Sequence, residues 1–126
     1  MKNQMLLVVA ALSLASLAGA AELKPFDAQE FQKAKSEGKT VALDFHANWC
    51  ATCKKLHPTL EKLLGKEEFE YVQAYTVDYD KAKDLEQALG VRKQSTVVVF
   101  KGDKEMGRAT GLSGADSISE LLRKGL

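Results

Sequence analysis

The chain has 126 residues, a length that fits one domain and excludes a multidomain protein. Hydrophobic residues make up 45% of it and charged residues 28%, as in ordinary globular proteins. Lys and Arg number 18 against 17 Asp and Glu, and this near balance argues against nucleic acid or an anionic membrane surface as the main partner.

The N-terminus has the pattern of a secretory signal peptide. Lys2 precedes a mainly apolar run over residues 5–17, and the small residues 18–20 resemble a signal-peptidase site. We therefore predict a signal peptide over 1–20 and a domain over 21–126, with cleavage at the end of the signal or one residue later. The alternative is a retained membrane anchor, but the apolar run is shorter than the ~20 residues that a spanning helix needs.

Two elements are predicted before the cysteines. A helix begins after Asp27, a good N-cap, and runs to about Glu37. Residues 41–45 predict a buried strand in which Asp44 is the only carboxylate. A carboxylate in an apolar strand is costly unless it is paired or neutralised, so Asp44 is a candidate functional residue. The alternative is that Asp44 faces solvent at the end of the strand.

A second helix is predicted from Ala51 to about Gly65. Pro58 lies inside it and should kink it, because proline lacks an N–H and clashes with the preceding turn. His57 stands directly before this proline. The apolar stripe of the helix is formed by leucines spaced three and four apart, namely Leu56, Leu60, Leu63 and Leu64.

Further strands and helices alternate in the second half of the chain. Because strands alternate with helices, we expect a parallel core with an antiparallel hairpin at its edge. The predicted elements are a strand over 69–77, a helix from Asp80 to Leu89 that buries Leu85, Ala88 and Leu89, a strand over 96–100 covered on both faces, a returning strand over 105–110, and a last helix capped by Ser113 or Asp116.

Cys50 and Cys53 are the only cysteines, and they lie where a predicted strand gives way to a helix. The first helical turn presents unpaired N–H groups and the positive end of the helix dipole, which stabilise a thiolate at Cys50. Cys53 follows one turn later and can attack a mixed disulfide formed at Cys50. The alternative, a purely structural disulfide, would close a very small loop and remove little chain entropy.

The segment VALDFHANWCATCK, residues 41–54, resembles the active site of thioredoxins, and it is also similar to the C-terminal domain of the membrane reductase DsbD. The resemblance covers nearly all of the predicted domain. It implies an α/β thioredoxin fold, with a central mixed β-sheet of about four strands flanked by about four helices.

The resemblance also implies residue roles. Cys50 would be the exposed nucleophile, Cys53 the buried resolving thiol, and Asp44 the buried acid that helps to move the proton of Cys53. The lysine that accompanies this acid in many thioredoxins is absent. Substrate contacts are expected from residues beside the two cysteines in space, namely Trp49, Ala51, Thr52, Ser95 and Thr96.

The chain departs from the family pattern at two positions. Ser95 stands where thioredoxins carry a cis-proline, and because a cis bond before another residue costs ~3–4 kcal/mol, we predict a trans Gln94–Ser95 peptide. In the family the loop that carries this proline pairs with the substrate backbone and shields the cysteines from metal, so its loss puts broad substrate binding in doubt and makes metal or iron–sulfur capture more conceivable. The alternative is sequence drift in a site that still works. Thr52 stands where strong oxidants of the superfamily carry a histidine, which favours a reductase or a relay.

Two functions follow from these residues. The first is exchange of disulfides with protein substrates by a periplasmic or secreted monomer, with no cofactor, restored by a membrane-bound or other thiol reductant. The second is a metal or iron–sulfur binding module that uses Cys50, Cys53 and His57, with His46 as a further ligand. Against the second, His57 can be a surface residue at the kink, and His46 can line the active-site surface or tune the Cys50 thiolate.

Overall fold

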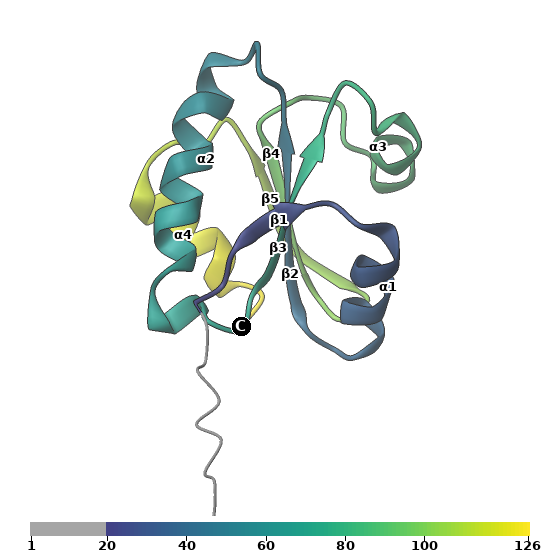
Figure 1. Ribbon diagram of the computed structural model, residues 1–126, viewed down its shortest axis with the longest axis vertical. Helices are drawn as coiled ribbons and strands as arrows, with labels where there is room; N and C mark the ends of the chain where they lie inside the picture. Colours follow the sequence, from purple (N-terminus) through teal and green to yellow (C-terminus); the bar gives the residue numbers. More distant parts are fainter. Residues whose placement is uncertain (1–19) are drawn as a thin grey trace, which may run out of the picture.

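The computed structural model describes residues 20–126, so all but the last residue of the predicted signal peptide lies outside the described residues. A five-stranded sheet forms the centre, with helices on both faces (Figure 1). The elements in chain order are β1 (Leu23–Pro25), α1 (Ala28–Ser36), β2 (Thr40–His46), α2 (Ala51–Leu64), the short 3₁₀ helix η1 (Glu67–Phe69), β3 (Gln73–Asp78), α3 (Lys83–Leu89), β4 (Thr96–Lys101), β5 (Lys104–Thr110) and α4 (Ala115–Arg123).

The strands are arranged in the order β1-β3-β2-β4-β5. β3 pairs in parallel with both β1 and β2, whereas β4 pairs antiparallel with β2 and with β5. This is the mixed sheet of the thioredoxin fold, as predicted. The antiparallel pairing is not confined to the edge hairpin, however, because it extends to β2 in the middle of the sheet.

Each face of the sheet carries its own hydrophobic core. Helices α2 and α4 cover one face, and α1 and α3 the other (Figure 1). In β4, Val97 and Val99 belong to the first core, while Val98 and Phe100 belong to the second. The prediction that this strand is covered on both faces is therefore confirmed.

The alternation of β2 decides which of its side chains meet α2. Val41, Leu43 and Phe45 belong to the core under α1 and α3, and Ala42 belongs to the core under α2. Because successive side chains of a strand point to opposite faces, Asp44 and His46 lie on the same face as Ala42. The sheet thus turns one carboxylate and one imidazole toward α2.

Several predicted boundaries are wrong for local reasons. Residues 67–69 form η1, which buries Phe69, so β3 begins only at Gln73. Helix α3 begins at Lys83 with Ala82 as its N-cap, and Asp80 lies before it. Ala88 is exposed, and Glu86 is the buried residue of that helix.

The ends of the domain also differ from the prediction. The three-residue strand β1 was not predicted at all. The N-cap of α4 is Gly114, which offers no side-chain hydrogen bond, so neither Ser113 nor Asp116 caps that helix. Helix α1 is capped by Asp27 as predicted, its side chain accepting from the N–H of Glu30 at 2.9 Å.

Candidate functional site

Cys50 and Cys53 lie at the start of α2, just beyond the carboxyl end of β2. A turn closes between the N–H of Cys50 and the carbonyl of Ala47 at 3.1 Å, and it delivers Cys50 in an extended conformation as the N-cap of the helix. The N–H of Cys53 donates to the Cys50 sulfur at 3.2 Å. A thiolate at Cys50 therefore receives a backbone hydrogen bond from the open end of a helix, where negative charge is stabilised.

The two sulfur-bearing residues differ in access. Both are free thiols, but Cys53 is fully buried, and Cys50 keeps 5% of its surface. The expectation of an exposed nucleophile is therefore corrected: Cys50 is nearly buried, because the cap conformation tucks its sulfur over the first turn of α2. Of the two cysteines, only Cys50 keeps any exposed surface, so it is the one that we expect a partner to approach.

Burial raises the pKa of the Cys53 thiol above its ordinary value, and the hydrogen bond with Cys50 raises it further. The backbone of Ala47 and the hydroxyl of Ser95 act in the opposite direction and lower the same pKa. At neutral pH Cys53 is therefore a protonated thiol that needs a base before it can attack.

Ser95 lies beside Cys53 in a strained backbone conformation. Every peptide bond within residues 20–126 is trans, which confirms the prediction for Gln94–Ser95. Ser95 has a φ of 59°, a left-handed value that few residues other than glycine adopt. Its N–H donates to Phe45 at 2.8 Å and its carbonyl accepts from Gly111 at 2.9 Å, whereas its buried hydroxyl has no hydrogen-bond partner. That hydroxyl is thus free to serve a charged Cys53.

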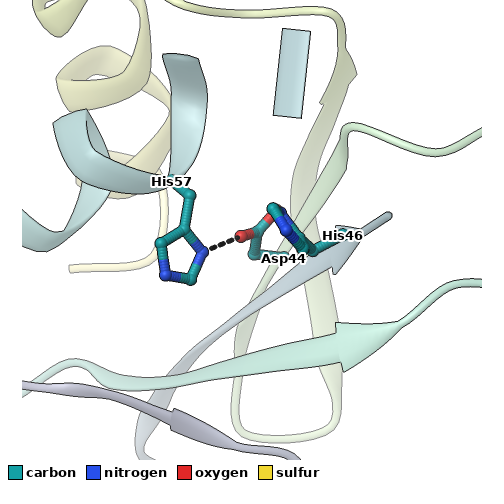
Figure 2. A group of neighbouring side chains, drawn as sticks. All are labelled: Asp44, His46 and His57. Carbon is teal, nitrogen blue, oxygen red and sulfur yellow. Dashed lines mark ion pairs between the residues drawn. The ribbon is translucent and has the colours of Figure 1, made fainter. Parts of the chain in front are cut away.

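Asp44 is fully buried, as expected for a functional acid, and it faces a partner that the sequence analysis missed. The Nδ1 of His57 lies 3.5 Å from the Asp44 Oδ2 (Figure 2). The Asp44 carboxylate raises the pKa of His57 above its ordinary value, with a smaller contribution from Glu61. His57 therefore takes the place of a basic partner for this acid.

His57 is not grouped with the cysteines. The structure places it with Asp44 and His46, and the ring centroids of His46 and His57 lie 5.0 Å apart. This corrects the predicted ligand set of Cys50, Cys53 and His57. One signal in the sequence could have located this cluster. Asp44 and His46 are two residues apart on one strand, and the face that they share is the one that α2 covers.

The other residues predicted to contact a substrate differ in their exposure to solvent. Trp49 is 61% exposed, and its indole N–H donates to Asp80 at 2.9 Å. Ala51 is exposed and Thr52 half-buried. Thr96 is buried, and its hydroxyl bonds to the Lys93 carbonyl at 2.8 Å and the Thr110 hydroxyl at 2.7 Å, so a side-chain contact with a substrate would have to break these bonds.

A hollow of about 560 Å³ lies beside the active-site loop, at the carboxyl ends of β2 and β3. Its lining includes His46, Asn48, Asp78 and Asp80. In the part of the chain that the structure covers, no helix has the length and apolar character needed to cross a membrane.

Comparisons with known proteins agree with this geometry. The family model "Thioredoxin" matches residues 22–124. The chain is 34% identical over 88 residues to Thioredoxin-1 of Saccharomyces cerevisiae, covering 70% of this chain and 84% of the yeast protein. It is 38% identical over 84 residues to the thioredoxin of Chlamydia muridarum, covering 67% of this chain and 80% of that protein.

A solved structure gives the same result in three dimensions. The crystal structure of Trxlp from Edwardsiella tarda matches with a TM-score of 0.77 and 26% identity, covering 80% of this chain and 98% of the other.

Proposed function

Because the chain belongs to the thioredoxin family, whose members are protein-disulfide oxidoreductases, we propose that it is an exported reductase of protein disulfides that works through Cys50 and Cys53. Thiol–disulfide exchange with protein substrates is the family activity. The periplasmic or secreted location, the direction of electron flow, the monomeric state and the source of electrons are parts of the proposal.

The observation that carries this function is the placement of the two cysteines, since Cys50 is the N-cap of α2 and keeps 5% of its surface, whereas Cys53 is fully buried in the first turn. The Cys50 thiolate attacks one sulfur of a substrate disulfide, which forms a mixed disulfide and releases the other substrate sulfur as a thiolate. Cys53 then attacks the Cys50 sulfur, which closes the Cys50–Cys53 disulfide and releases the second substrate thiolate. The substrate gains two electrons, and the enzyme dithiol is oxidised by two.

The second step needs a base, because burial raises the pKa of Cys53 and keeps it protonated at neutral pH. We assign this role to Asp44. Its carboxylate oxygens are buried without a hydrogen-bond partner, and its neighbour His57 is only partly buried and so connects it toward solvent. The Ser95 hydroxyl assists by favouring the Cys53 thiolate.

We infer the direction of exchange from Thr52. It stands where strong oxidants carry a histidine, and a threonine stabilises the Cys50 thiolate less well than an imidazolium does. We infer the same direction from the resemblance of residues 41–54 alone to the C-terminal domain of DsbD. A membrane-bound thiol reductant would then return two electrons to the Cys50–Cys53 disulfide after each turnover.

Two matched variants test the mechanism. Cys50→Ser should abolish reduction of a protein disulfide such as insulin, because the accessible nucleophile is lost. Cys53→Ser should still form a mixed disulfide but fail to release it, so that the enzyme–substrate conjugate accumulates on a non-reducing gel. Undiminished turnover by Cys50→Ser would reject the assignment.

The equilibrium reduction potential of the Cys50–Cys53 couple tests the direction. A value near ~−270 mV is expected for a reductase, and a value near ~−120 mV would indicate an oxidant. Export is tested separately by cell fractionation and N-terminal sequencing of the mature protein, which should begin at Ala21 or Glu22.

A further inference from the structure

Asp44, His46 and His57 bring three metal-ligating side chains together away from the cysteine sulfurs. One donor atom from each residue lies within 4.8 Å of the others. Asp44 and His46 project from β2, and His57 projects toward them from α2 (Figure 2). We refer to these three residues as the Asp–His cluster.

The outer nitrogens of both imidazoles are already occupied. The His46 Nε2 lies 3.2 Å from the Asn48 Oδ1, and the His57 Nε2 lies 3.1 Å from the Glu61 Oε1. Because both of these oxygens can accept a hydrogen bond, we assign the ring hydrogen of each neutral imidazole to Nε2. In each neutral imidazole the Nδ1 is then left with its lone pair.

The inner atoms of the cluster are buried and unsatisfied. Both Asp44 oxygens and the Nδ1 atoms of His46 and His57 lack a hydrogen-bond partner. Two nitrogen lone pairs and a carboxylate in one buried space repel one another unless a positive centre lies among them. A proton on His57 would satisfy that ring and Asp44, but it would leave the His46 Nδ1 without a partner. A cation bound to Asp44, His46 and His57 gives each of these three side chains a partner.

We propose that Asp44, His46 and His57 form a binding site for a divalent transition-metal ion of the zinc type. Two imidazoles and one carboxylate are a ligand set that zinc accepts, with a fourth position left for water. The bonds to Asn48 and Glu61 match the outer-shell contacts that orient metal-ligating histidines. His46 also lines the hollow beside the active-site loop, so one residue of the cluster borders solvent-filled space.

The cluster must contract to hold the ion, since donors in a zinc tetrahedron lie only about 3.3 Å apart at zinc–ligand distances of about 2.0–2.1 Å. Side-chain rotation can supply this movement, because both histidines are only partly buried. The site does not use the cysteine sulfurs, so zinc binding in the disulfide form can hold or fail independently of the proposed roles of Cys50 and Cys53. A bound ion would, however, engage Asp44, the base that we propose for Cys53.

The test uses the protein with Cys50 and Cys53 joined as a disulfide, which removes the thiolates that would otherwise compete for zinc. Titration with Zn²⁺ by calorimetry, and with Co²⁺ by visible absorption, should show one ion per chain with a low-symmetry, nitrogen- and oxygen-ligated cobalt spectrum. Glu61→Gln changes an outer-shell contact and should weaken binding by about tenfold, and His46→Ala and His57→Ala should each weaken it more. Asp78→Asn is the matched control, because Asp78 lines the same hollow but is not in the cluster.

Two results would overturn the site. One is the absence of a zinc heat and a cobalt spectrum at ion concentrations up to about a hundredfold over the protein. The other is binding that His46→Ala leaves unchanged. His46→Ala breaks no ion pair, so it remains informative if His57→Ala unfolds, and circular dichroism of each variant verifies that the fold is intact.

Discussion

His57→Ala should destabilise the fold more than Asp44→Asn, which removes the charge that His57 faces. Asp44 is fully buried, whereas the His57 side chain is 29% exposed. His57→Ala therefore leaves a carboxylate without a partner in the interior, but Asp44→Asn leaves an imidazole that can still reach water and Glu61. Breaking a buried pair from the side of its exposed member costs the desolvation of the charge that stays behind.

The size of the effect follows from the distance and the exposure. Two unit charges 3.5 Å apart attract by about 5 kcal/mol at an effective dielectric constant of about 20. Water at the exposed part of His57 screens this to about half. We expect His57→Ala to cost about 3 kcal/mol and Asp44→Asn about 1 kcal/mol or less. The double variant should be about 2 kcal/mol more stable than His57→Ala alone.

The assay is urea unfolding of the disulfide form, followed by circular dichroism in the presence of EDTA. The loss of stability caused by His57→Ala should also depend on pH, because Asp44 raises the pKa of His57. A raised pKa contributes stability that is fully present below the unfolded value of about 6.5 and is lost as the pH rises through the folded value. The groups that face His57 are Asp44, Glu61 and the ring of His46.

The gap between the wild-type protein and His57→Ala should therefore be wider at pH 6 than at pH 9. Asp44→Asn should lack most of this pH dependence. If His57→Ala and the double variant have the same free energy of unfolding at both pH values, Asp44 and His57 are not coupled, and the reasoning is refuted.

Three further outcomes are expected. Gly125→Ala should lower the free energy of unfolding in urea by about 1–3 kcal/mol, because the added methyl would lie 2.6 Å from the Val99 Cγ1 and 2.7 Å from the Thr40 Cγ2. An unchanged midpoint would show that the C-terminus moves aside without cost. The dithiol form should lose stability as the pH rises above about 8.5, since burial raises the pKa of Cys53, and Cys53→Ala should show a shallower slope in the same unfolding experiment. Ser95→Ala removes the hydroxyl that lowers the Cys53 pKa, so closure of the enzyme disulfide at neutral pH should slow by up to about tenfold in quenched-flow measurements, and an unchanged rate would exclude this role.

Much of the fold could be predicted because the responsible signals are local. The leucine spacing of α2 and the side-chain cap at Asp27 are read directly from neighbouring residues, and both are confirmed. The short strand β1 and η1 carry no such periodicity. β1 is held by its pairing with β3, which joins residues about fifty positions apart in the chain.

The candidate site was likewise predictable only where local sequence determines it. The positions of Cys50 and Cys53 follow from one strand–helix junction, so the sequence suffices to place them. The partner of Asp44 does not follow from local pattern, because it depends on how α2 lies across β2. His57 was interpreted through its spacing from Cys53 along the helix, although its ring turns toward the sheet.

The hydrogen bond between Trp49 and Asp80 has a practical consequence. Trp49 is the only tryptophan of the chain, and it stands directly before Cys50 with most of its surface in solvent. Its ultraviolet emission is thus a single-site optical probe attached to the active-site loop. A docked polypeptide or a change in sulfur oxidation state will alter the light that this indole emits, and turnover can be followed without any added dye.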